Sequence, residues 1–95
     1  MPQGMRGTWY PRSTAEQAEL DWHVLEVARL LGAKGEHISP LGVRARLSRT
    51  VGTKWLIASL ARLHVGGWIE PFARNRYGRV KSYKAAGKAL DSLRK

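Results

Sequence analysis

A helical repeat of apolar residues is the first clear pattern along the chain. It recurs at i, i+4, i+7 and i+11, at Leu20, Val24, Val27 and Leu31. This spacing gives an amphipathic helix one apolar face. Ser13 and Glu16 have the spacing of a capping box, which marks the start of this helix, and Gly32 is expected to end it. Residues 1–12 show no periodicity, so we predict an arm or tail there and a folded domain over 13–95.

A second, shorter helix is expected after a connector in which 36–38 is compatible with a small strand. Ser39 followed by Pro40 is an N-cap and first-turn pair, and it predicts a helix over 40–47. The residues expected to face the core are Leu41, Ala45 and either Val43 or Leu47.

A third helix follows the turn at 48–50. Thr50 is a suitable N-cap for a helix over 51–65, and Gly66 with Gly67 is expected to end it. Its apolar face consists of Leu56, Leu60 and Leu63, widened by Trp55. The opposite face offers Thr53, Lys54, Ile57 and Arg62.

The period then changes from helical to two. Residues 68–73 predict a strand, which Pro71 limits to the edge of a sheet. Residues 74–79 are rich in Asn, Gly and Arg and predict a turn, with a return strand over 80–83. A last helix is expected over 85–93, with Ala86, Ala89, Leu90 and Leu93 on its apolar face.

The predicted fold is mainly α with a small β-hairpin, in the order α-(β)-α-α-β-β-α. Two short helices joined by a tight turn form a helix-turn-helix. A hairpin directly after the second of them predicts a winged helix-turn-helix.

Two motifs flank the predicted hairpin. They are Leu60-x-x-Leu63-x-x-x-Gly67-Trp68-Ile69 and Tyr83-Lys84-Ala85-Ala86-Gly87-Lys88-Ala89-Leu90. They resemble the end of the recognition helix and the start of the post-wing helix in MarR- and PadR-like prokaryotic transcription regulators. The resemblance covers 20–93 and implies a DNA-binding domain whose third helix enters the major groove.

The chain also departs from that family. Lys84 stands where the family usually has Thr or Ser as a helix cap, so Ser82 is the expected substitute. The long terminal helices of full-length MarR-like regulators are absent. The resemblance therefore implies neither their dimer nor their ligand pocket, and no small-molecule ligand is expected.

Charge is distributed unevenly along the chain, whose net charge is +10. From His37 to Lys95 there are thirteen Lys or Arg against two acids, whereas residues 1–36 have four against five. A cationic half of this kind suits a polyanion, and nucleic acid is the commonest one. A solvated basic surface with no partner remains the plain alternative.

Catalysis has little support in the composition. The chain has no Cys, which excludes disulfides, thiolate metal sites and a Cys nucleophile. The three His lack metal-ligand spacing, and the acids Glu16, Glu19 and Asp21 are explained as helix-start residues. We predict no enzymatic activity, no catalytic or metal-binding residue and no cofactor. With no membrane-spanning apolar run and no signal peptide, a cytoplasmic, nucleoid-associated protein is expected.

Three elements are expected to contact double-stranded DNA. The third helix with its preceding turn would read base edges in the major groove, and the second helix would hold the backbone. The hairpin tip would reach the minor groove or the phosphates. The residues are Arg44, Arg46, Arg49, Thr50, Thr53, Lys54, Ile57, Arg74, Asn75, Arg76, Arg79, Lys81 and Lys84. A sequence-specific transcriptional regulator is the function predicted.

Two other function classes stay open: an RNA-binding winged-helix protein, and a protein-interaction or assembly module of a nucleic-acid complex. A single short domain makes few base contacts, so a homodimer on a two-fold site is expected for useful specificity. The N-terminal arm, the first helix and the last helix are candidate dimer surfaces. Trp9 and Tyr10 of the arm have three open roles, namely packing on the domain, stacking on a partner, or touching nucleic acid.

Overall fold

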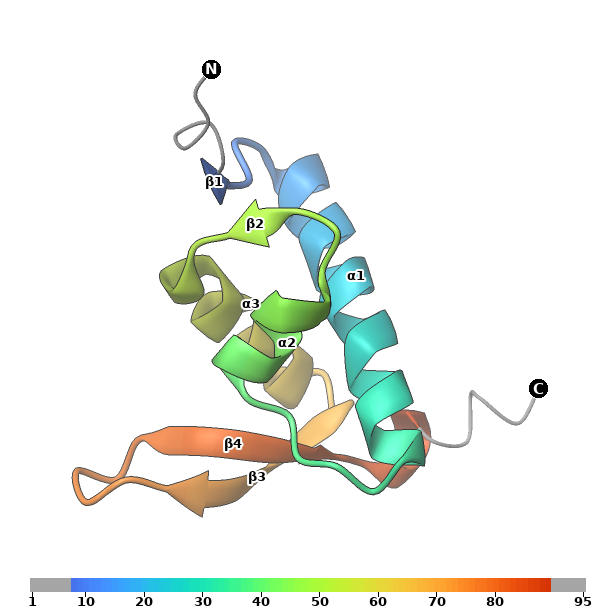
Figure 1. Ribbon diagram of the computed structural model, residues 1–95, viewed down its shortest axis with the longest axis vertical. Helices are drawn as coiled ribbons and strands as arrows, with labels where there is room; N and C mark the ends of the chain where they lie inside the picture. Colours follow the sequence, from blue (N-terminus) through green and yellow to red (C-terminus); the bar gives the residue numbers. More distant parts are fainter. Residues whose placement is uncertain (1–7, 90–95) are drawn as a thin grey trace.

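The computed structural model describes residues 8–89, a small mixed α/β structure in which helices pack on an antiparallel two-stranded sheet (Figure 1). The elements are β1 (Thr8–Trp9), α1 (Thr14–Ala33), α2 (Pro40–Arg46), β2 (Thr50–Val51), α3 (Thr53–Val65), β3 (Ile69–Arg74) and β4 (Val80–Ala85). A further helical turn begins at Gly87. The expected last-helix residues Leu90 and Leu93 lie outside the described part of the chain.

The start of α1 follows the sequence pattern, and its end does not. The Ser13 hydroxyl accepts a hydrogen bond from the Glu16 amide, as predicted, while the Glu16 carboxylate accepts from the Arg12 amide. Gly32 does not end the helix, which continues to Ala33. Gly35 does, because its φ of 74° lets the Glu36 amide donate back to Leu31 in a Schellman motif.

The second helix begins as predicted and ends one residue early, at Arg46. The Ser39 hydroxyl accepts from the Gly42 amide at 3.1 Å, and Pro40 occupies the first turn. Val43 is buried and Leu47 half-buried, four residues apart on one side. The expectation that Leu41 and Ala45 face the core is wrong, because they share the other side and are exposed.

The third helix begins two residues later than predicted. Thr50 is not its N-cap, because Thr50 and Val51 form β2, which pairs in parallel with β1. Gly52 takes the N-cap position without a side-chain hydrogen bond. The end is as predicted, since Gly67 has a φ of 84° and the chain closes there in a second Schellman motif.

The hairpin between β3 and β4 is longer on its return strand than predicted. The pairing runs from Ile69↔Ala85 to Arg74↔Val80, with two register shifts between Pro71 and Arg74. Because β4 extends to Ala85, the last helix starts at Gly87 rather than at 85, and Ser82, inside β4, cannot cap it. The small strand expected at 36–38 is reduced to one antiparallel bridge, Ile38↔Tyr83, with hydrogen bonds of 2.8 and 2.7 Å.

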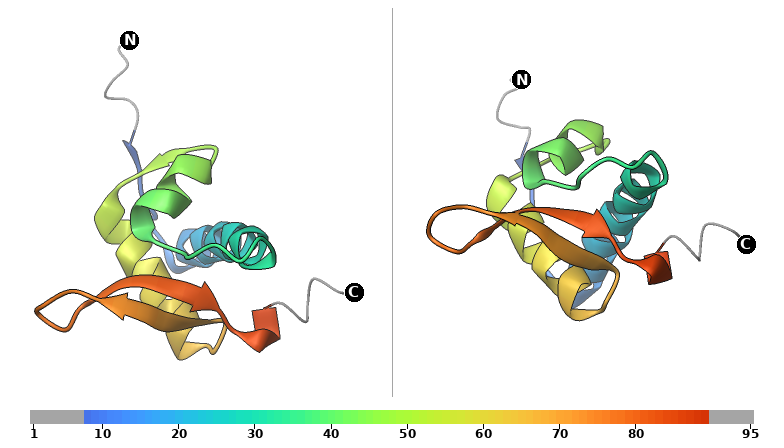
Figure 2. Two further views of the ribbon diagram at one scale, coloured as in Figure 1. Left: turned by 60° about the horizontal axis from the view of Figure 1, so that its bottom comes forward. Right: turned by 90° about the horizontal axis from the view of Figure 1, so that it is seen from below.

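The core lies where the three helices meet the sheet. Its fully buried large side chains come from every layer: Val24, Leu31, Ile38, Val43, Val51, Leu56, Leu60 and Ile69. In all views α1 lies across the molecule from the hairpin tip (Figures 1 and 2). Because Leu56 and Leu60 of α3 and Ile69 of β3 belong to the same core, the core fixes the position of α3 relative to the hairpin.

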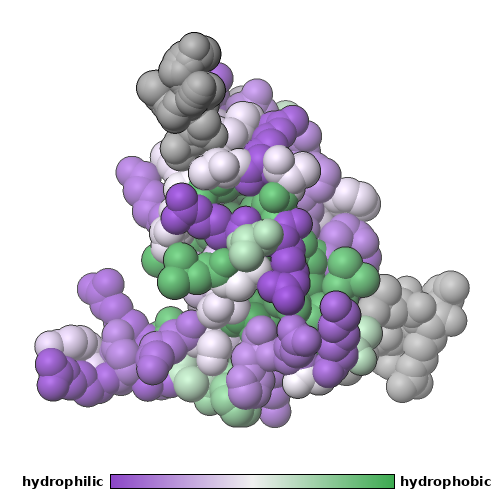
Figure 3. Space-filling view, viewed as in Figure 1, coloured by the Kyte–Doolittle hydropathy of each residue, from purple (hydrophilic) through white to green (hydrophobic). Residues whose placement is uncertain are grey.

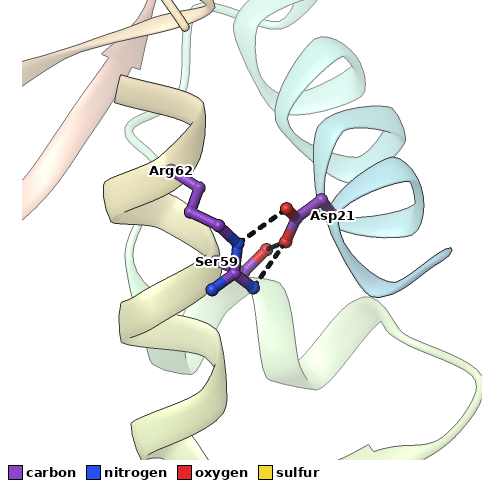
Figure 4. A network of polar contacts seen from close by, with 3 residues as sticks. All are labelled: Asp21, Ser59 and Arg62. Carbon is purple, nitrogen blue, oxygen red and sulfur yellow. Dashed lines mark hydrogen bonds and ion pairs between the residues drawn. The ribbon is translucent and has the colours of Figure 1, made fainter. Parts of the chain in front are cut away.

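A polar network also joins α1 to α3 (Figure 4). The Asp21 carboxylate accepts two hydrogen bonds from Arg62, at 2.8 and 2.9 Å, and one from Ser59 at 2.6 Å. Hydrogen bonding to Asp21 raises the pKa of Arg62 above its ordinary value, and Ser59 is fully buried. Arg62 therefore does not belong to the exposed face of α3, and Asp21 is an interhelical partner rather than only a helix-start acid.

Candidate nucleic-acid interface

Asn75 organises the tip of the hairpin. Its side-chain oxygen accepts hydrogen bonds from the amides of Tyr77 and Arg79, at 2.8 and 3.1 Å. Gly78, with a φ of 86°, completes the turn, and Arg74 donates to its carbonyl at 2.8 Å. These contacts give Asn75 a structural role in the turn and hold Arg74 along the ribbon.

The other cations of the tip are open to solvent. Arg76, Arg79 and Lys81 are exposed, and none of them has a carboxylate partner within residues 8–89. The Arg76 guanidinium lies 5.3 Å from the centroid of the Tyr77 ring, which is itself 76% exposed. The tip therefore presents uncompensated positive charge on a thin, well-hydrogen-bonded ribbon.

The N-terminal half of α3 exposes a mixed surface. Lys54 is exposed, with its Nζ 4.8 Å from the centroid of the neighbouring Trp55 ring. Ile57, one turn along, is 53% exposed, while Thr53 is half-buried. Thr50 is exposed just ahead, on β2. This end of the helix offers one cation, one apolar side chain and hydroxyl groups.

The segment before α1 adds residues that the sequence prediction left undecided. Tyr10 stacks on Trp55 with ring centroids 5.7 Å apart, and the Arg12 guanidinium lies 4.7 Å from the Tyr10 ring. Hydrogen bonding with the Tyr10 side chain is the main cause that raises the pKa of Arg12. Of the three open roles for Trp9 and Tyr10, the structure shows packing on the domain. In the sequence, the only sign of this packing was the pair of adjacent aromatic residues.

The three arginines around α2 do not act alike. Arg44 is exposed without an ion pair within the described residues. Arg46 donates to the Gly42 carbonyl at 3.3 Å and lies 3.7 Å from Glu36. Arg49 lies over the Trp9 ring at 5.0 Å. Arg46 and Arg49 both line a groove against α1, so the structure separates them from Arg44.

Lys84 also stands apart from the rest of the expected set. Its Nζ is 3.9 Å from Glu70, its partner across the hairpin. Successive side chains of a strand alternate between faces, and the neighbour Tyr83 is buried with its ring 6.0 Å from His64 of α3. Lys84 therefore faces away from α3. Burial raises the pKa of Tyr83, an effect that the nearby charge of Arg74 partly offsets.

Two of the elements that carry the remaining candidates lie on one side of the molecule. The hairpin tip and the N-terminal end of α3 project to the same side in every view (Figures 1 and 2). Hydrophilic side chains gather at the tip of the hairpin in the space-filling view (Figure 3). The acids of α1, namely Glu16, Glu19, Asp21 and Glu26, belong to the helix that lies across from the tip.

No protein-family model, no curated protein and no solved structure matches this chain. Within residues 8–89, no three His, Cys, Asp or Glu side chains are grouped so as to hold a metal ion. None of the helices in that part of the chain has both the length and the apolar character to cross a membrane.

Proposed function

We propose that this protein is a winged helix-turn-helix DNA-binding protein and acts as a sequence-specific transcriptional regulator. In this reading α2 and α3 are the helix-turn-helix, with α3 in the major groove, and the hairpin β3–β4 is the wing. The observation that carries the proposal is that the hairpin tip and the N-terminal end of α3 project to the same side, and that both elements carry cations without a carboxylate partner within residues 8–89.

Electrostatics supports a polyanionic partner at this surface. Arg44, Lys54, Arg76, Arg79 and Lys81 have no carboxylate partner in the described chain, so a phosphate backbone can neutralise them without breaking a native ion pair. Each neutralised phosphate releases counterions, so the binding constant K falls as salt is added. For duplex DNA, the slope of log K against the logarithm of the salt concentration is about −0.9 for each phosphate contact. If about four or five of these cations contact phosphates, the expected slope is roughly −4.

The chemistry at the start of α3 bears on sequence readout. Lys54 can donate to the O6 and N7 atoms of guanine, and Ile57 can contact the methyl group of thymine. Because only a few side chains reach base edges, the expected recognition element is short. Arg76 and Arg79 would lie in or beside the minor groove and position the domain rather than read sequence.

A selection from a pool of random DNA duplexes tests the proposal. Enrichment of a short motif, lost in a Lys54→Ala/Ile57→Ala variant, is the result expected. Titration of a selected duplex and of an RNA duplex of the same sequence separates the RNA alternative, because the narrow major groove of A-form RNA excludes α3. Binding to the RNA that is as tight as binding to the DNA would contradict this proposal. So would the absence of salt-dependent binding to either duplex.

A further inference from the structure

A groove of about 380 Å³ lies between α1 and the chain that joins α2 to β2. Its apolar lining includes the buried residues Leu20, Val27 and Val51. Trp22 of α1 also lines it and is 57% exposed, although its indole is among the largest apolar side chains of the protein. Figure 3 shows hydrophobic surface between hydrophilic side chains where α2 and β2 pass in front of α1.

The two walls of this groove have opposite charge. Glu19 and Glu26 come from α1, whereas Arg46 and Arg49 come from the end of α2 and the link to β2. The walls do not neutralise each other. Glu26 pairs with Arg29 on its own helix at 2.6 Å, and Glu19 lies 3.8 Å from His23, also on α1. Arg46 lies 3.7 Å from Glu36, outside the groove. Arg49 has no carboxylate partner among the described residues and lies over Trp9.

We propose that this groove is the surface through which two copies of the chain associate about a two-fold axis. In an isologous interface each patch meets its own copy, so a patch with one acidic and one basic wall is complementary to itself. The acidic wall of each copy would face the partner's basic wall. Each Trp22 would leave water by entering the other groove, and Trp is strongly enriched among residues that dominate binding energy.

This dimer leaves the hairpin free. None of the residues lining the groove belongs to β3, β4 or the turn between them. The inference does not rest on nucleic-acid binding, because self-association is measured with the protein alone.

Sedimentation equilibrium of the full chain, without nucleic acid, tests the proposal at physiological ionic strength. The apparent mass should rise with concentration from 10.7 kDa toward twice that value. Trp22→Ala should weaken the dimer at least about tenfold, as loss of a central aromatic anchor does. The matched control is Leu30→Ala, because Leu30 is also 57% exposed on α1 and lies outside the groove, and it should change the dissociation constant less than about twofold.

Charge reversal provides a second test that survives any folding defect of the Trp22 variant. Glu19→Lys and Arg49→Glu should each be monomeric alone, because each sets like charges against each other at both two-fold-related contacts. An equimolar mixture of the two variants should form a heterodimer. One of its two contacts pairs the introduced lysine with the introduced glutamate across the interface, and the other contact keeps the native pair of Glu19 with Arg49.

Three results would overturn the proposal. The first is a wild-type chain that stays at the monomer mass at every concentration. The second is equal weakening by Trp22→Ala and Leu30→Ala, which would put the interface elsewhere on α1. The third is a charge-reversed mixture that remains monomeric.

Discussion

Two regions of this molecule treat their charged side chains in opposite ways. Between α1 and α3, the Arg62 guanidinium and the Ser59 hydroxyl are held by the Asp21 carboxylate in a closed network. At the hairpin tip, Arg76 and Arg79 have no carboxylate partner within residues 8–89. In a chain of net charge +10, the comparison separates cations that serve the fold from cations available to a polyanion.

Replacing Asp21 by Ala should have the largest effect on the paired region. It removes the acceptor of the buried Ser59 hydroxyl and leaves a half-buried Arg62 without its counter-charge. Because the ion pair is partly exposed, we expect a loss of about 2 kcal/mol in the free energy of unfolding. The midpoint of thermal unfolding, followed by circular dichroism, should fall by roughly 8–16 °C.

Glu70→Ala is the matched control for that change. It also removes a carboxylate from an ion pair, but the pair with Lys84 is exposed on both sides and 3.9 Å long. A change of less than about 0.5 kcal/mol is expected. If both variants unfold at the same temperature, Asp21 has no special role in holding α1 to α3.

Arg76→Ala and Arg79→Ala should leave stability unchanged and weaken DNA binding, each by roughly three- to tenfold at low salt. All duplex sequences should be affected alike, because phosphate contacts carry no sequence information. The slope of log K against log salt should become shallower by about 0.9 for each variant. Lys34→Ala removes the same charge at the end of α1, across the molecule from the tip, and should keep the slope of the parent.

Thr53→Ala and Lys54→Ala should distinguish side chains that read base edges from those that contact only phosphates. We expect the preference for a selected site over a scrambled duplex to change by about fivefold, since these side chains would contact base edges. Competition binding at one salt concentration measures that ratio. Arg79→Ala is the control, because it should lower both affinities and keep their ratio. The docking of α3 would be wrong if all variants lowered both affinities equally.

The smallest effect concerns Tyr83, which lies between the two regions. Burial raises its pKa, so the folded state favours the neutral phenol. The corresponding stability is present below the unfolded pKa of about 10 and is lost as pH rises through the folded value. The difference in phenolate absorbance between wild type and Tyr83→Phe should give that midpoint, and Arg74→Ala should move it further upward. A midpoint at or below the ordinary value would contradict the burial.

Local signals in the sequence predicted the element order well. Ser13 and Ser39 cap the helices that they were expected to cap, and Gly66-Gly67 ends the third one. These predictions held because each depends on hydrogen bonds within a few residues. The misplaced start of α3 has a tertiary cause, since Thr50 and Val51 pair with Thr8 and Trp9, about forty residues earlier in the chain.

The candidate site was less predictable because side-chain partners come from distant elements. Nothing local marks Asp21 as the partner of Arg62, or sets Arg49 beside Trp9. Periodicity also cannot tell which face of a short helix is inside, so Leu41 and Ala45 were placed wrongly. The charge pattern identifies the cationic half of the chain, whereas packing decides which of its cations pair with Asp21 or Glu70, which line the groove and which have no carboxylate partner within residues 8–89.

The parallel pairing of β1 with β2 has a practical consequence for anyone handling the protein. Because Thr8 is paired with Thr50 directly ahead of α3, the described chain begins beside the proposed DNA face. The end of the described chain at Ala89 lies next to the far end of α1 (Figure 1). For binding measurements, we therefore expect a surface attachment or label to interfere less when it follows the end of the described chain than when it precedes Thr8.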